Sequence, residues 1–67
     1  MGSKPNRVNA VKTNIRVVNA LADNGPSGVT ELANDLGMAK STVHVHLSTL
    51  VDEGLVINDG AQYRLSL

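Results

Sequence analysis

Residues 38–55 read MAKSTVHVHLSTLVDEGL, and the rest of the chain is organised around this stretch. Because an α-helix turns by roughly 100° per residue, Val43, Leu47 and Leu50 fall along one line of a helix. The pattern predicts a helix with a buried apolar face, closed by Gly54. The opposite face carries mostly polar side chains with one valine among them: Ser41, Val45, Ser48, Thr49 and Asp52.

The amino end of this predicted helix holds one cation and several hydrogen-bonding side chains, namely Lys40, Ser41, Thr42 and His44. Small polar groups allow a ligand to approach the backbone closely, and the free N–H groups of a first helical turn favour a phosphate. This end of the helix therefore suits a DNA groove. The alternative is an ordinary surface helix with a start rich in serine and threonine, and the neighbouring elements decide between the two.

Length and composition bound the class of protein. A chain of 67 residues makes one domain, and at this size only about 60% of the surface of the unfolded chain is buried on folding, so a partner subunit would add stability. The sequence has no cysteine, which excludes a disulfide framework and a thiolate zinc site. It has no apolar run near the roughly 18 residues of a membrane helix and no signal-peptide pattern. We therefore expect a soluble, cytoplasmic protein that does not bind membranes.

The net charge is zero, but the charges are unevenly distributed along the chain. Before Asp23 there are four cations and no acid: Lys4, Arg7, Lys12 and Arg16. From Asp23 onward there are six acids and only two cations, Lys40 and Arg64, so the net charge of this part is −4. Such a split indicates either a basic arm that follows phosphate or a solubilising tail. We predict a flexible basic segment over residues 1–10 and a folded domain over residues 11–67.

A first helix is predicted over residues 13–24, with a possible start at Asn6. Thr13 is a suitable N-cap, and Gly25 suits the left-handed position after the helix. Val17 lies off the apolar stripe and is expected to contact a partner. The stripe that we expect to face the core or a second subunit consists of Val8, Val11, Ile15, Val18, Leu21 and Ala22.

A short second helix follows, with Thr30 as its expected N-cap and Gly37 as its left-handed end. Its inner face is formed by Leu32, Ala33 and Leu36. Only a tight glycine turn separates it from the helix that begins near Lys40, so the pair predicts a helix-turn-helix unit. The second helix of such a unit is the one that recognises DNA.

The end of the chain predicts a β-hairpin. Residues 55–57 and 62–67 are rich in strand-forming residues, and Asp59-Gly60 between them is a favoured hairpin turn. Tyr63 and Leu65 share one strand face, so Tyr63 is expected to pack on the third helix and Arg64 to point outward. The predicted fold is mainly α with a small β-hairpin, a three-helix winged helix-turn-helix.

Several segments resemble the DNA-binding domain of IclR-type transcriptional regulators. They are Thr30-Glu31-Leu32-Ala33, Leu36-Gly37, Lys40-Ser41-Thr42-Val43-His44, Leu47, Leu50, Glu53-Gly54 and Tyr63-Arg64-Leu65. The resemblance covers residues 11–67. It implies a homodimeric regulator that binds palindromic double-stranded DNA, and an effector-binding domain that is absent from this chain. Family members commonly carry arginine where this chain has Val45, and an apolar residue where it has His46.

Candidate DNA contacts lie on all three helices and the hairpin. They are Lys12 and Arg16 on the first helix, Thr30 on the second, Lys40, Ser41, Thr42, His44, Val45 and Ser48 on the third, and Asn58, Gln62 and Arg64 on the hairpin. The recognition helix would enter the major groove, with the hairpin on flanking backbone. A winged helix that binds another protein is the alternative, which the neutral charge and Val45 would suit.

Catalysis and metal binding are disfavoured by the spacing of the candidate residues. His44 and His46 are two residues apart, whereas a helical metal pair needs a spacing of three or four. There is no Gly-x-Ser-x-Gly elbow and no phosphate loop with a lysine-hydroxyl ending. We therefore expect no enzyme activity and no cofactor, and we expect His46 to be a half-buried packing residue.

Overall fold

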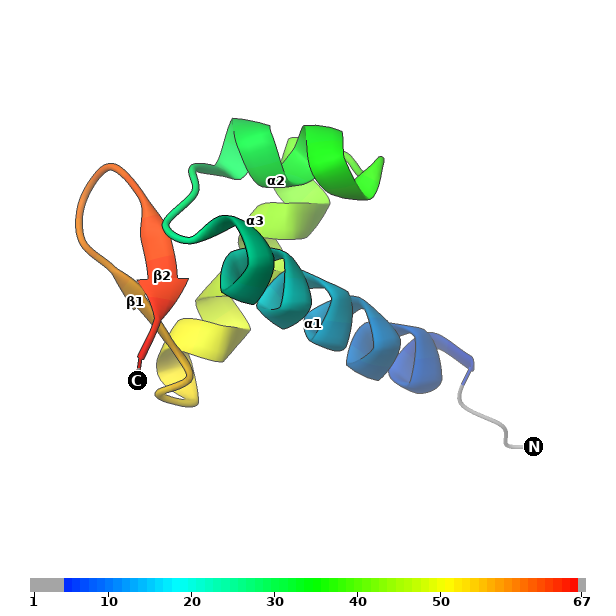
Figure 1. Ribbon diagram of the computed structural model, residues 1–67. Helices are drawn as coiled ribbons and strands as arrows, with labels where there is room; N and C mark the ends of the chain where they lie inside the picture. Colours follow the sequence, from blue (N-terminus) through cyan, green and yellow to red (C-terminus); the bar gives the residue numbers. More distant parts are fainter. Residues whose placement is uncertain (1–4, 67) are drawn as a thin grey trace.

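The computed structural model describes the backbone of residues 5–66 and the side chains of residues 9–66. Lys4 and the side chain of Arg7, both predicted to belong to the basic segment, lie outside this description. Figure 1 shows three helices and a two-stranded hairpin, in the order α1 Pro5–Asn24, α2 Val29–Leu36, α3 Lys40–Asp52, β1 Val56–Asn58 and β2 Tyr63–Leu65. The predicted winged helix-turn-helix fold is confirmed. None of the helices in residues 5–66 is long and apolar enough to span a membrane.

The core lies where the three helices meet the hairpin. Figure 1 shows α1 crossing in front of α3, with α2 above them and the hairpin to one side. Each element contributes buried apolar side chains: Val17 and Leu21 from α1, Leu32 and Ala33 from α2, Val43, Leu47 and Leu50 from α3, and Val56 and Tyr63 from the hairpin. The buried line predicted for α3 and the inner face predicted for α2 are both present, although Leu36 is only partly buried.

The first helix differs from the prediction in its start and in its buried face. It begins at Pro5, so Thr13 lies inside the helix and is not its N-cap. Val17 is 0% exposed, whereas Val11 and Ile15 are each 55% exposed. The prediction that Val17 contacts a partner was therefore wrong. The helix is buried along a line through Asn14 and Val17, and the polar residue on that line concealed it from the apolar pattern.

Asn14 is accommodated because a second half-buried polar side chain faces it from α3. The Oδ1 atom of Asn14 accepts a hydrogen bond from Nδ1 of His46 at 2.7 Å. Burial of a polar group costs free energy unless the group is hydrogen-bonded. The bond between Asn14 and His46 offsets this cost for both side chains. His46 is half-buried as predicted, and its bond to α1 was not anticipated.

The N-cap of the second helix lies two residues before the expected one. Its N-cap is Gly28, and Thr30 lies within the first turn. The N–H of Gly28 donates to Oε1 of Glu31 at 3.0 Å, so the carboxylate of Glu31 satisfies the N-cap amide and sits at the positive helix end. The helix ends as predicted at Gly37, whose φ of 66° is left-handed and whose N–H donates to the carbonyl of Ala33.

In the hairpin, which we call the wing (residues 56–65), the first strand is shifted by one residue from the prediction and the second is shorter than predicted. The strands are antiparallel, with Ile57 opposite Arg64. Tyr63 also pairs with Ser27 in the loop before α2, through N–H to carbonyl bonds of 2.9 and 2.8 Å in the two directions. This bridge ties the wing to the helix-turn-helix unit, so the wing is held at both its α3 end and its β2 strand.

Candidate nucleic-acid interface

The outward face of α3 is exposed and mostly polar. Its predicted contact residues Lys40, Ser41, Thr42, His44, Val45 and Ser48 are all exposed. On the inner face Val43 and Leu47 are fully buried, which fixes the rotation of the helix about its axis. Val45 is the one apolar side chain in the outward group and is 62% exposed. All six helix candidates are therefore accessible, and they are spread over more than half of the helix circumference, with Lys40 and Thr42 on its two flanks.

The amino end of α3 has backbone donors without helical acceptors. Ala39 is the N-cap, in an extended conformation, and no side chain among the described residues caps it. The first intrahelical bond runs from Val43 N–H to the carbonyl of Ala39 at 3.1 Å. The preceding N–H groups are consequently free to bind water or an anion, and the helix dipole favours the anion.

A groove separates α3 from the wing. It is lined by His44, Ser48, Val51, Asp52, Asn58 and Tyr63. Tyr63 is buried against the core, as predicted, and its hydroxyl lies 3.5 Å from Nδ2 of Asn58. Asp52 puts a carboxylate in this groove, where it would repel a phosphate. The predicted contacts His44, Ser48 and Asn58 thus line one depression.

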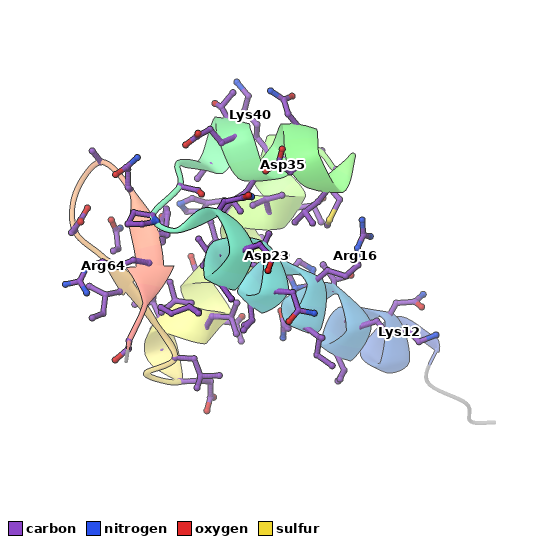
Figure 2. All side chains as sticks on the ribbon, in the orientation of Figure 1. Lys12, Arg16, Asp23, Asp35, Lys40 and Arg64 are labelled. Atoms are coloured by element: carbon purple, nitrogen blue, oxygen red, sulfur yellow. The ribbon has the colours of Figure 1, made fainter. Side chains whose placement is uncertain are left out.

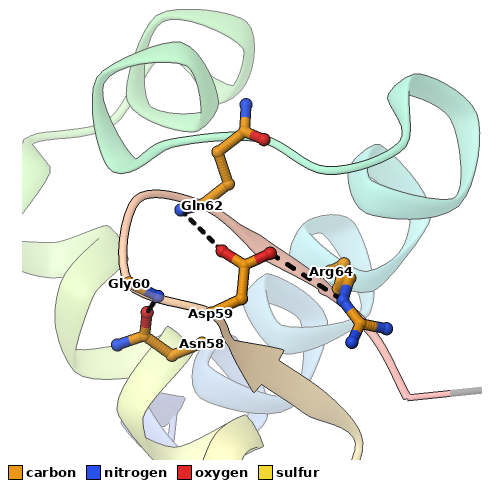
Figure 3. A network of polar contacts seen from close by, with 5 residues as sticks. All are labelled: Asn58, Asp59, Gly60, Gln62 and Arg64. Atoms are coloured by element: carbon orange, nitrogen blue, oxygen red, sulfur yellow. Dashed lines mark hydrogen bonds and ion pairs between the residues drawn. The ribbon is translucent and has the colours of Figure 1, made fainter.

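The wing turn contains a network of polar contacts that the residue pattern alone did not suggest (Figure 3). Oδ2 of Asp59 lies 3.9 Å from Nε of Arg64, and Oδ1 of Asp59 accepts a hydrogen bond from Gln62 N–H at 3.2 Å. Oδ1 of Asn58 accepts from Gly60 N–H at 3.0 Å. Asn58 and Arg64, both predicted to contact DNA, therefore already have partners within the wing.

The cations of the first helix are set apart from the wing. Figure 2 shows Lys12 and Arg16 along α1, away from Arg64 on the wing and from Lys40 at the start of α3. Lys12 is exposed, whereas Nη2 of Arg16 donates to the carbonyl of Leu36 at 2.9 Å. Arg16 therefore caps the carboxyl end of α2, a role that its place in the sequence does not predict. Thr30 is exposed on α2.

A second surface, the apolar groove between α1 and the end of α3, lies outside this interface. Its walls are Val11, Asn14, Ile15, Val18, Thr49, Leu50, Glu53 and Leu55. Leu55, like Val11 and Ile15, is more than half exposed. Among residues 5–66, no group of three or more histidines, cysteines and acids lies together in a way that could hold a metal ion.

Comparison with known proteins gives results in agreement with this geometry. The model of the IclR helix-turn-helix domain matches residues 14–60. A probable HTH-type transcriptional regulator ArcR from Halobacterium salinarum is 28% identical over 57 residues, which cover 85% of this chain and 22% of that protein. The chain therefore spans about a fifth of the length of that relative.

Two solved structures share the fold. The Zalpha domain from Carassius auratus PKZ in complex with Z-DNA matches with a TM-score of 0.82 and 27% identity, over 84% of this chain and 95% of that one. HmgR from Pseudomonas aeruginosa matches with a TM-score of 0.76 and 27% identity, over 84% of this chain and 24% of that one. The fold thus occurs both as nearly the whole of one solved chain and as a part of a much longer one.

Proposed function

Because the chain belongs to the IclR helix-turn-helix family, we propose that it binds double-stranded DNA in a sequence-specific manner as the DNA-binding domain of a transcriptional regulator. In this proposal the outward face of α3 enters the major groove and the wing lies on the flanking backbone. The matched relative ArcR is a probable transcriptional regulator, which supports the regulatory role. No catalytic step is part of the proposed function.

The observation that carries the proposal is the division of α3 into two faces. Val43, Leu47 and Leu50 hold the helix against the core, and the opposite face is exposed and mostly polar. Lys40 and Thr42 stand at the amino end, where a helix in the major groove makes its base contacts. Lysine reads the acceptor edge of guanine and threonine can bond either a base or a phosphate.

We assign the remaining predicted contacts to the DNA backbone. Gln62 and Arg64 would flank the groove from the wing, with Asn58 at its base. Thr30, Lys12 and Arg16 would contact phosphates on the helix side. Arg16 has further N–H groups beyond the one donated to Leu36, because a guanidinium carries five donors.

The proposal is tested by selecting binding sites from random duplex DNA and titrating the selected site against salt. Lys40→Ala and Thr42→Ala should each weaken binding by about 1–3 kcal/mol and leave the melting temperature nearly unchanged. Thr49→Ala is the matched control, since Thr49 is on the same helix but its hydroxyl bonds the carbonyl of Val45. Wild-type affinity in both amino-end variants would refute the assignment of α3.

A second candidate ligand is left-handed DNA. The match to a Zalpha domain in complex with Z-DNA, at a TM-score of 0.82, favours including it. A duplex of alternating cytosine and guanine, held in the left-handed form, provides the probe, and circular dichroism reports its handedness. Preference for this duplex over the selected right-handed site would replace sequence-specific recognition with recognition of DNA shape.

The alternative of a protein-binding module rests on two observations. The net charge is zero, and Val45 is 62% exposed in the middle of the outward face. DNA binding driven by phosphate contacts weakens as salt rises, whereas an apolar protein contact does not. Failure to bind any duplex at low salt would favour the protein partner.

We further propose that the full regulator is a homodimer that uses α1. Val11 and Ile15 stand more than half exposed beside Leu55, and contact between two copies would bury these side chains. A two-fold dimer would match a palindromic site. Ile15→Lys should reduce the dimer fraction on DNA in sedimentation experiments without unfolding the domain. Asp23→Asn is the control, because Asp23 is an exposed residue of the same helix and the substitution changes the net charge by the same amount. We expect an effector-binding domain in the full regulator and a cytoplasmic location.

A further inference from the structure

The wing carries a carboxylate that is oriented toward its own arginine. Asp59 and Arg64 approach to 3.9 Å between Oδ2 and Nε, on opposite sides of the hairpin turn (Figure 3). The other oxygen of Asp59 accepts the N–H of Gln62 at 3.2 Å. Because one oxygen is held by the backbone, the second is directed toward Arg64 by the turn itself.

The turn that positions Asp59 is closed by several further bonds. The N–H of Asp59 donates to the carbonyl of Gln62 at 3.0 Å, and Asn58 accepts from Gly60 N–H at 3.0 Å. Gly60 has a φ of 105°, which other residues rarely adopt, so it completes the turn without strain. The carboxylate therefore stays at the wing tip whether or not Arg64 remains beside it.

The ion pair itself adds little to folding stability. The two side chains are 47% and 46% exposed, and the separation is near the limit for an ion pair. Exposed pairs of this kind contribute little, because water screens them and two side chains lose freedom. Its effect would be felt when a phosphate approaches, since the phosphate must compete with Asp59 for Arg64 and is repelled by the same carboxylate.

We propose that Asp59 is a counter-ion built into the wing, which weakens the contact of Arg64 with DNA phosphates. This inference rests on the proposed DNA-binding function. Because a phosphate contact carries no sequence information, Asp59 lowers the affinity for every duplex by about the same factor. The residue is a positioning residue for Arg64 and contacts no base.

The test compares Asp59→Asn with Asp23→Asn. Asparagine keeps the acceptor oxygen that the turn uses for Gln62 N–H but removes the charge. Asp23 is an exposed acid on α1, so its substitution changes the net charge by the same amount away from the wing. Asp59→Ser, which keeps an acceptor and can also form the turn, replaces Asp59→Asn if a melting curve shows that the asparagine variant is unfolded.

The expected result is tighter binding to mixed-sequence duplex DNA by roughly three- to tenfold at low salt for Asp59→Asn, with a log–log salt slope steeper by up to about one. The selected site should gain by the same factor, so the ratio of the two affinities should stay unchanged, and a gain confined to one of the two duplexes would contradict a phosphate contact. Asp23→Asn should change affinity and slope much less. If Asp59 acts through Arg64, the gain in DNA affinity from Asp59→Asn should be smaller when it is made in the Arg64→Gln variant than in the wild type.

The outcomes separate this inference from the function on which it rests. If the wild-type domain binds duplex DNA with a salt-dependent affinity but Asp59→Asn binds equally well, only the role of Asp59 is overturned. An equal gain with and without Arg64 also overturns it, because the carboxylate would then act as a general negative charge. If the wild-type domain binds no duplex DNA, both the function and this inference fall.

Discussion

The helices α1 and α3 both carry apolar residues at helical spacing, yet only α3 is buried along the line that its sequence predicts. On α3 the predicted line of Val43, Leu47 and Leu50 is buried. On α1 the predicted stripe includes Val11 and Ile15, which are exposed, and excludes Val17, which is completely buried. The two helices differ in how many of their faces could have been the inner one.

On α3 the choice of face was determined by the scarcity of apolar residues on the other side. Only Val45 interrupts its outward surface, so a single rotation of the helix buries the apolar line. On α1 valines and isoleucine occur on more than one side, and two stripes were available. An ambiguous amphipathic pattern is resolved by what packs against it, here α3 with His46 opposite Asn14.

The largest effect that tests this comparison is expected for Leu47→Ala. Leu47 is fully buried on α3, where such a truncation costs about 2–5 kcal/mol, and a domain of this size has little more stability to lose. Most of the population should be unfolded in a thermal melt. Val45→Ala on the same helix removes an exposed side chain and should melt like the wild type. A small shift for Leu47→Ala would mean that the buried face of α3 is misassigned.

A smaller effect is expected on α1, from Val17→Ala compared with Ile15→Ala. Val17 is 0% exposed, so its truncation should cost about 1.5–3 kcal/mol of unfolding free energy. Ile15→Ala removes more atoms than Val17→Ala, but Ile15 is 55% exposed, so this truncation should lower the unfolding free energy much less. Urea unfolding of the two variants measures the difference. A larger loss for Ile15→Ala than for Val17→Ala would mean that α1 is buried along the stripe predicted from the sequence.

The hydrogen bond between Asn14 on α1 and His46 on α3 should contribute less to the free energy of unfolding than Val17 does. Removing either Asn14 or His46 leaves its partner half-buried without a hydrogen bond, whereas removing both does not. A double-mutant cycle with Asn14→Ala and His46→Ala should give a coupling energy of about 1 kcal/mol in unfolding experiments. Additive effects of the two substitutions would show that the bond does not determine which face of α1 is buried.

The smallest effect concerns the outward cations of α1. If Lys12 and Arg16 contact phosphates, Lys12→Gln with Arg16→Gln should make the log–log salt slope of DNA binding shallower by about one unit per lost contact. Glutamine is shorter than arginine and does not reach the carbonyl of Leu36 as Nη2 of Arg16 does, so a thermal melt first checks that the double variant is folded. Deletion of residues 1–9 tests the basic segment separately. An unchanged slope in the double variant would refute the backbone role of α1 and strengthen the protein-partner alternative.

The candidate site was predictable in part. The outward residues of α3 followed from the period of the helix once its apolar line was known, and all of them are exposed. The partners of Arg16 and Arg64 did not follow, because Leu36 is 20 residues from Arg16 along the chain and the Asp59–Arg64 pair depends on the geometry of the turn. Whether the predicted contacts bind DNA, and whether the domain divides at residue 10, stay predictions.

The sequence by itself determined the order of elements, their glycine ends and the inner faces of α2 and α3. These features are local, since Gly37 must adopt a positive φ and an apolar line must leave water wherever the chain folds. Only the tertiary structure decided the inner face of α1, the Gly28 cap in place of Thr30, and the bridge between Ser27 and Tyr63. Those features depend on which surface or backbone group another part of the chain presents, and no local pattern contains that information.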